Sequence, residues 1–296
     1  MGRWRPSTRA TNLGTLEKHV LPVLGEIPLA EVDKFKCQVL LNNLAAKSFS
    51  LSVVDHCRIM VGAVLEEALD ADLISKNPIR KVENPDTKEP ARPVLSKADA
   101  SRLIAALPAF RDRLIAMIAT FCAMRPGEIF GLERGSFRGD HFFVQGTAWR
   151  GTLQPGKAKT KGSKAAVVIP DAIIPLVKAW LETTPTGVAT DLLFPSARPG
   201  VPLWPSRWLE HRVQPIARQL GITTKVNFQV LRRSFATNAQ QVGSAKDLQT
   251  HLRHSKINTT MDVYTQPVDE SVRRMVNSFA DEVLGLQPTV SSNRVQ

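Results

Sequence analysis

The stretch from Asn84 to Pro93, which reads NPDTKEPARP, divides the chain into two parts. Three of its ten residues are proline and few are apolar, so it can neither continue a helix nor add to a core. Such composition is typical of a linker that proline stiffens. We therefore expect a first domain of residues 1–84, a linker of residues 85–93, a second domain of residues 94–287 and a disordered tail of residues 288–296.

The first domain has apolar side chains at helical spacing. They recur every three to four residues in 29–46 and again in 51–74, which predicts two amphipathic helices. A shorter apolar pattern covers 16–24, and a serine at 50 or 52 can cap the last helix. Residues 1–14 are polar and basic, and we expect them to form a loose lead-in. The first domain is thus predicted to be a small helical module.

The second domain combines helices with a little β-structure. Residues 111–124 are apolar on most faces, which predicts a buried central helix. Segments 141–147 and 165–169 are rich in β-branched and aromatic residues and predict strands, joined by a basic Gly, Lys and Thr-rich hairpin or loop. Helical patterns return after residue 171, one of them at 257–265, and end with an amphipathic segment at 269–284. The predicted fold class is mainly α with a small β-hairpin or sheet.

The charge distribution favours a polyanionic partner. The first 90 residues contain equal numbers of basic and acidic side chains, so the whole net charge of +12 lies downstream of them. An excess of this size favours nucleic acid, although a merely basic soluble protein would show it too. There is no phosphate-binding glycine loop, no HExxH motif and no group of carboxylates suited to two metals. We therefore expect no metal or nucleotide cofactor, and basic side chains must neutralise any phosphate.

The expected compartment is the cytoplasm. The chain has no signal-peptide pattern and no apolar run long enough to cross a bilayer, so no membrane association is expected. Its cysteines, Cys37, Cys57 and Cys122, are odd in number and lack ligand spacing, which is typical of reduced thiols.

Two arginine segments have the chemistry to bind an anion. Arg125 directly precedes Pro126 at a predicted helix start, where free main-chain N–H groups favour anions, and Glu128 can orient it. A surface arginine in a turn is an equally good interpretation of Arg125 alone. Arg232 and Arg233 lie in an apolar helical stretch, QVLRRSFATNA, where two guanidinium groups are costly unless they are paired. A structural pairing with acidic side chains also fits them.

Four segments, taken in order, resemble the tyrosine recombinase (phage integrase) family. MRPGEIFGL is similar to the first arginine box of that family, and KTKGSKAAVVIP to its β-hairpin lysine segment. The resemblance assigns the first arginine to Arg125, its acidic partner to Glu128 and the catalytic lysine to Lys159, with Lys161 as a rival.

The other two segments supply the remaining site residues. VLRRSFAT is similar to the second arginine box, and LRHSKINTTMDVY to the box that carries a histidine and the nucleophile. This places the second arginine at Arg232, the histidine at His254 and the nucleophile at Tyr264, the only tyrosine of the chain. TLEKHVLPVLGEIPLAEV also resembles the start of the family's helical core-binding domain, so the likeness covers nearly the whole chain.

The resemblance implies a site-specific recombinase or integrase. Arg125 and Arg232 would hold the scissile phosphate, Tyr264 would form a 3′-phosphotyrosyl link, and Lys159 would protonate the leaving 5′-oxygen. The implied partner is double-stranded DNA at specific attachment sites, bound by a homotetramer through the C-terminal helix 269–284. That helix could equally pack within its own chain. Further DNA contacts are expected from Lys157, Lys161, Lys164, Arg233 and Arg253.

The chain departs from the family pattern at one position that matters for chemistry. Gln229 stands three residues before Arg232, where the family usually has histidine. Glutamine cannot take a proton near neutral pH, so reduced activity is expected. Arg253 and Arg233 replace the usual glycine and histidine. The alternatives are a DNA-binding protein with weak or lost catalysis, and a topoisomerase-like enzyme without partner exchange.

Overall fold

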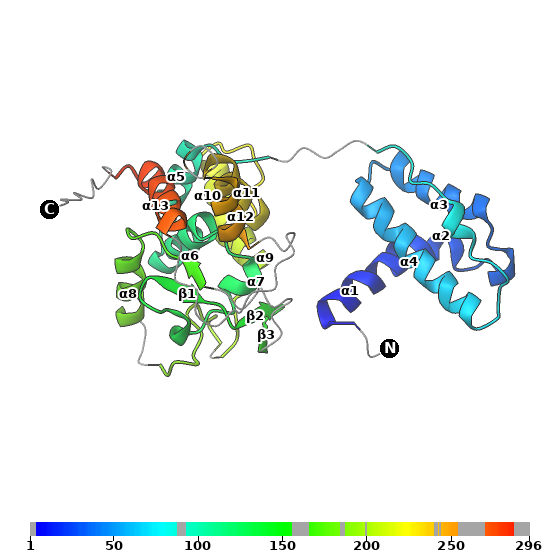
Figure 1. The fold of residues 1–296 in the computed structure, drawn as a ribbon, viewed down its shortest axis with the longest axis horizontal. Helices are drawn as coiled ribbons and strands as arrows, with labels where there is room; N and C mark the ends of the chain where they lie inside the picture. Colours follow the sequence, from blue (N-terminus) through cyan, green and yellow to red (C-terminus); the bar gives the residue numbers. More distant parts are fainter. Residues whose placement is uncertain are drawn as a thin grey trace. The chain divides into compact units, whose positions relative to one another are not determined.

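The computed structural model describes residues 4–87, 93–155, 166–183, 187–198, 200–239, 242, 244–253 and 270–286. The chain divides into two compact units, Met1–Ala91 and Arg92–Gln296 (Figure 1). The division falls within the proline-rich stretch, although most of the linker and the tail of residues 288–296 lie outside the described residues. The finer domain limits given above stay a prediction.

The first unit is helical throughout its described part. In chain order it contains α1 (Pro6–Thr15), a π-helical turn (Leu16–Val20), α2 (Leu21–Leu24), a 3-10 turn (Leu29–Glu31), α3 (Lys34–Ala46), α4 (Leu51–Asp70) and a second 3-10 turn (Pro78–Lys81). The apolar faces of α3 and α4 form its core, in which Leu40, Leu41 and Val54 are fully buried. Asp33 caps α3 by accepting a hydrogen bond from the main chain of Lys36, and Ser50 occupies the N-cap position of α4.

Two sequence predictions in this unit are wrong. Residues 6–15 form helix α1 instead of a loose lead-in, because Pro6 begins the helix and α1 packs against α4, which is distant in sequence. Apolar periodicity does not predict such a helix, because its sequence is polar and its stability comes from tertiary contacts. Helix α4 also ends at Asp70, short of the predicted residue 74, and Asp72 adopts a left-handed conformation beyond it.

The second unit is built around one buried helix. Its elements are α5 (Lys97–Ala106), α6 (Phe110–Phe121), α7 (Pro126–Ile129), a 3-10 turn (Arg134–Ser136), β1 (His141–Phe143), β2 (Gly146–Trp149), β3 (Thr152–Pro155), β4 (Ala166–Val168), α8 (Ile174–Thr183), α9 (Pro205–Trp208), a π-helical turn (Leu209–Val213), α10 (Gln214–Gln219), α11 (Phe228–Ala239), α12 (Ala245–Leu252) and α13 (Glu270–Leu284). Helix α6 contacts α5, α7, α8, α11 and α13, as its apolar sequence predicts (Figure 1).

The β-structure is more divided than the sequence suggests. Strand β1 pairs with β4, and β2 pairs with β3, each pair antiparallel. The predicted strand of residues 141–147 is therefore two strands, and β3 lies in the segment that was predicted to be a hairpin or loop. Arg150 and Gly151 both have positive φ between β2 and β3, which is the backbone that a tight hairpin turn requires. The β2–β3 hairpin therefore precedes the lysine-rich residues in sequence.

Helix α13 packs within its own unit. Its apolar residues Val272, Met275, Val276, Phe279 and Val283 are all buried in the core. Arg273 also pairs with Asp140 at 2.6 Å and with Asp171 at 2.8 Å, which ties the helix to the ends of β1 and β4. This is the intramolecular alternative that the sequence left open beside contact with a neighbouring protomer.

Two general predictions concern the cysteines and the membrane. All three cysteines are buried and free. Among the residues described above, none of the helices has the length and apolarity needed to cross a bilayer. The predicted helix at 257–265 lies outside the described residues.

Candidate functional site

Arg125 and Glu128 are locked together at the start of α7. Arg125 is the N-cap residue, and Pro126 fills the first helical position. Glu128 accepts hydrogen bonds from the main-chain N–H of Arg125 at 2.9 Å and from its Nη1 at 3.1 Å. The Glu128 side chain is only 3% exposed, whereas that of Arg125 is 46% exposed. The buried carboxylate thus holds a guanidinium that still faces solvent.

Two glycines, in and just after α7, allow the helix to pack closely on strand β2. A Cβ atom at Gly127 would lie 2.9 Å from the main-chain oxygen of Ala148, and one at Gly131 would lie 2.8 Å from its nitrogen. Only glycine allows this approach without a shift of the main chain. The β2–β3 hairpin is therefore fixed directly beside the helix that carries Arg125.

The predicted lysines follow this hairpin. Strand β3 ends at Pro155, and Lys157, Lys159, Lys161 and Lys164 come after it, outside the described residues. The choice between Lys159 and Lys161 therefore stays open.

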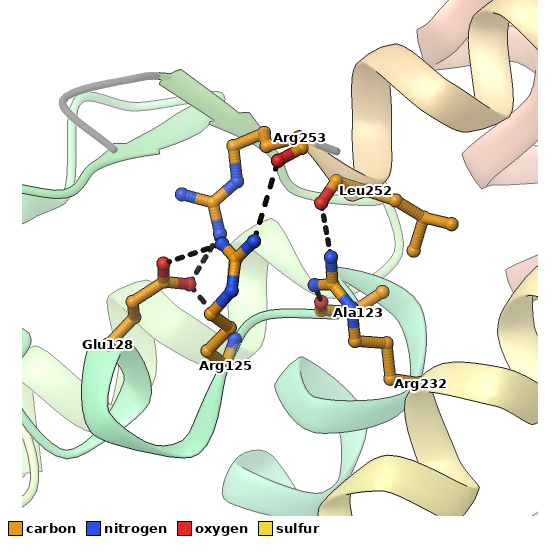
Figure 2. Close-up of polar contacts among 6 residues, drawn as sticks. All are labelled: Ala123, Arg125, Glu128, Arg232, Leu252 and Arg253. Carbon is orange, nitrogen blue, oxygen red and sulfur yellow. Dashed lines mark hydrogen bonds and ion pairs between the residues drawn. The ribbon is translucent and has the colours of Figure 1, made fainter. Parts of the chain in front are cut away.

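Arg232 reaches across the unit from α11. Its Nη1 donates to the main-chain oxygen of Ala123, just after α6, and its Nη2 to that of Leu252, the last residue of α12 (Figure 2). Carbonyl oxygens at helix ends carry partial negative charge, so they suit a cation. Burial lowers the pKa of Arg232 to about 10, and the positive charges of Arg125 and Arg253 act in the same direction. Arg232 stays charged at neutral pH, at an electrostatic cost.

Arg253 is turned inward toward Glu128. Its Nη2 lies 2.5 Å from Glu128 Oε2, and its side chain is only 6% exposed (Figure 2). Its main-chain oxygen accepts a hydrogen bond of 3.4 Å from Arg125 Nη2. Arg253 was expected to touch DNA directly. The structure instead places its guanidinium inside the protein, where it pairs with Glu128.

The cluster has an excess of positive charge. Arg125, Arg232 and Arg253 surround the single carboxylate of Glu128, which leaves two guanidinium charges uncompensated within this group. Buried charge of one sign is costly unless a counter-ion completes it. The arrangement is therefore suited to binding an anion, with Arg125 as its most exposed member.

His251 contributes to the framework and was not predicted as part of it. The ring is 4% exposed, and its Nε2 lies 2.9 Å from the main-chain oxygen of Phe121. Burial lowers the pKa of His251 to about 4, so the ring is neutral at pH 7 and Nε2 donates this hydrogen bond. The position of His251 one turn after Leu248 on a buried face of α12 was the available signal.

The remaining predicted residues divide into two groups. Gln229 is exposed in the first turn of α11, and Arg233 donates through Nη1 to the main-chain oxygen of Pro93 at 3.1 Å. His254 and Tyr264 lie outside the described residues, His254 immediately after the end of the described segment at Arg253. The structure thus brings together Arg125, Glu128, Arg232 and Arg253, and leaves the roles of all these residues as proposals.

Comparison with known proteins identifies the class. The model of the phage integrase family matches residues 93–271, and that of the phage integrase N-terminal SAM-like domain matches residues 2–45. The chain therefore belongs to the phage integrase family.

Curated relatives and solved structures agree with this. The chain is 29% identical to tyrosine recombinase XerD of Pseudomonas aeruginosa, over 65% of this chain and 63% of the relative. It is 30% identical to tyrosine recombinase XerC 1 of Ralstonia nicotianae, over 67% of this chain and 63% of the relative. The chain thus spans about 63% of the length of these two relatives. The integrase of Mycobacterium phage L5 is 23% identical over 92% of this chain and 75% of that protein.

The solved structures establish the fold. The Tn1549 transposon integrase in complex with transposon right end DNA superposes with a TM-score of 0.70, at 16% identity, over 94% of this chain and 95% of that one. A lambda integrase dimer bound to a COC′ core site superposes with a TM-score of 0.65, at 14% identity, over 88% and 93% of the two chains. The predicted two-domain, mainly helical fold with small antiparallel sheets is confirmed.

Proposed function

We propose that the chain is a site-specific DNA recombinase that cleaves and rejoins double-stranded DNA through a 3′-phosphotyrosyl intermediate. The observation that carries the proposal is the meeting of Arg125 and Arg232 at the end of α12. Both guanidinium groups bond to main-chain oxygens of Leu252 or Arg253, and the next residues lead to His254 and Tyr264. The two arginines proposed to bind phosphate therefore contact the residues that precede the proposed nucleophile most closely in sequence.

The chemistry consists of two phosphoryl transfers, one from DNA to Tyr264 and one from Tyr264 back to DNA. The phenol oxygen of Tyr264 forms a bond to phosphorus as the bond from phosphorus to the 5′-oxygen breaks. The phenol loses its proton to solvent water, and the leaving 5′-oxygen gains one from Lys159 or from Lys161. Arg125 and Arg232 stabilise the charge that develops on the non-bridging oxygens. Attack by a 5′-hydroxyl on the phosphotyrosine then restores the tyrosine and a continuous strand.

Gln229 makes activation of the tyrosine harder. Free tyrosine has a pKa near ~10, so forming phenolate at neutral pH costs roughly 4 kcal/mol. Glutamine can hydrogen-bond a phosphate or phenol oxygen but cannot accept the proton. The arginines and the phosphate must offset more of that cost, so we expect cleavage that is slower than a histidine at this position would give.

The proposed partners are attachment-site DNA and further copies of the chain. Support for DNA comes from the positive excess downstream of residue 90 and from the DNA complexes of the related folds. Support for a homotetramer on paired sites comes from the lambda integrase tetramer, which is bound to a Holliday junction. The proposed compartment is the cytoplasm, and the mechanism needs no metal or nucleotide.

One alternative is favoured by a specific observation. The exposed glutamine at position 229, one helical turn before Arg232, fits a DNA-binding protein whose catalysis is weak or lost. That alternative predicts tight DNA binding without a covalent intermediate, whereas a topoisomerase-like enzyme would cleave and relax DNA without exchanging partners.

A suicide substrate tests the proposal. Duplexes that bind the protein are selected from a random pool and nicked beside each candidate phosphate, so that cleavage releases a short strand and traps the intermediate. Wild-type protein should give a covalent adduct on a denaturing gel, and Tyr264→Phe should bind the same DNA without forming it. Tight binding by the wild type with no adduct at any nick position would leave only the DNA-binding alternative.

A further inference from the structure

Arg253 occupies a backbone position that suits glycine. It follows the last residue of α12 with φ 52° and ψ 46°, which is the left-handed conformation. A side chain at Cβ is strained in this conformation, so glycine is the residue that most often ends a helix in this way. An arginine here bears this strain, which contacts of its own side chain can offset.

Those contacts are an ion pair inside the protein. Arg253 Nη2 lies 2.5 Å from Glu128 Oε2, and the two side chains are 6% and 3% exposed. The Nε and Nη1 groups of Arg253 are buried without a hydrogen-bond partner in the part of the chain that the structure describes. Glu128 is therefore the contact that holds this guanidinium, and it lies on α7, far away in the sequence.

Glu128 is at the same time the partner of Arg125. Its Oε1 accepts from Arg125 Nη1, and its Oε2 accepts from both the Arg125 main chain and Arg253. One negative charge is thus divided between two guanidinium groups. Without Arg253, the charge of Glu128 would offset that of Arg125 more completely. The electrostatic attraction between Arg125 and an anion would then be weaker.

The main chain of Arg253 adds a second link. Its oxygen accepts a hydrogen bond from Arg125 Nη2, so Arg125 is held by the Arg253 carbonyl and by the carboxylate that Arg253 also binds (Figure 2). The orientation of Arg125 and the position of the α12 end therefore depend on the same set of contacts.

We propose that Arg253 is a positioning residue for DNA cleavage. Through Glu128 it orients Arg125 toward the scissile phosphate, leaves Arg125 with most of its positive charge, and fixes the end of α12 that precedes His254. It acts without touching DNA. This inference rests on the proposed function, because it assigns Arg253 a part in the cleavage step.

The test compares Arg253→Lys, Arg253→Met and Arg253→Gly on the nicked duplex. The measured quantities are the single-turnover rate constant of adduct formation and the Kd for the same DNA. Met keeps the length but not the charge, Lys keeps the charge, and Gly suits the left-handed backbone should Met fail to fold. Arg102→Met is the matched control, because Arg102 also pairs with a carboxylate, Asp99, but lies on α5 and away from the cluster.

The expected result is a loss of about tenfold in rate for Met and Gly, the effect of about one charged hydrogen bond. Lys should recover most of the rate, Kd should change less than about twofold, and Arg102→Met should match the wild type. In a Glu128→Gln background, Arg253→Met should have little further effect, because Arg253 acts through Glu128.

Three outcomes would overturn the inference while wild-type adduct formation leaves the proposed function standing. They are a wild-type rate for Arg253→Met and Arg253→Gly, a loss of DNA affinity as large as the loss of rate, and full additivity with Glu128→Gln. Absence of an adduct from the wild type itself would instead overturn the proposed function, and the role of Arg253 with it.

Discussion

Arg232 donates a hydrogen bond through Nη2 to the main-chain oxygen of Leu252, and so joins α11 to the end of α12. His251, one residue earlier, joins the same turn to the main chain of Phe121 at the end of α6. The end of α12 is therefore held by two helices of the core. In our account this end delivers the nucleophile-bearing segment to the phosphate-binding arginines.

Arg232→Lys should reduce the rate of DNA cleavage by about 10²–10³, the usual effect of removing one donor to a developing oxyanion. A lysine ammonium cannot span the oxygens of Ala123 and Leu252 and also present a flat pair of donors to phosphate. Single-turnover adduct formation measures the change, with Arg102→Lys as control. A loss smaller than about tenfold would show that Arg232 is structural.

Gln229→His should raise the cleavage rate at neutral pH or leave it level. Histidine can accept the phenol proton, and position 229 is exposed at the start of α11, so the substitution needs no repacking. A pH–rate profile on the suicide substrate checks this, since the variant should gain a dependence near pH 6–7. A large fall in rate would mean that Gln229 has a specific role that our account lacks.

Gly127→Ala and Gly131→Ala should each lower the free energy of unfolding by about 1–3 kcal/mol, the usual cost of overpacking. The new methyl group meets main-chain atoms of Ala148, which cannot move without shifting β2. Gly14→Ala is the control, because nothing lies within 4 Å of its Cβ position and alanine favours the surrounding helix. Urea unfolding followed by circular dichroism distinguishes them, and equal stability of all three variants would contradict the close packing of α7 on β2.

His251 should make the protein less stable in acid. Its pKa is about 4 when folded, below its ordinary value of 6.5, so between these pH values the unfolded chain binds the proton and the folded chain does not. Stability is therefore retained above about pH 6.5 and falls as the pH drops toward 4, by about 3 kcal/mol in total. His251→Gln should flatten this dependence, whereas His211→Gln, at an exposed site, should not. Unfolding free energies at pH 4 and pH 7 test the difference.

The sequence predicts the local parts of this protein well. Apolar periodicity locates α3, α4, α6 and α13, because a helix with one buried face repeats every three to four residues. The pairing of Arg125 with Glu128 was also predicted, since residues three apart meet at a helix start. Helix α1 escapes such reasoning, as its polar sequence depends on contacts with α4.

Contacts between distant segments could not be predicted in this way. The ion pair of Arg253 with Glu128 depends on where α12 ends and on a left-handed residue there, and neither leaves a periodic signal. Arg253 was therefore expected at the DNA surface. The roles of Lys159, His254 and Tyr264 came from family resemblance, and they remain predictions.

Mapping the covalent adduct tests the central claim most directly. Trypsin should release residues 257–273, which contain the only tyrosine of the chain. After trapping on the nicked duplex and nuclease digestion, mass spectrometry of this peptide should show a nucleotide phosphate on Tyr264, and the signal should vanish in Tyr264→Phe. A nucleotide attached to any other residue, or DNA bound tightly at its selected site with this peptide always unmodified, would contradict the account.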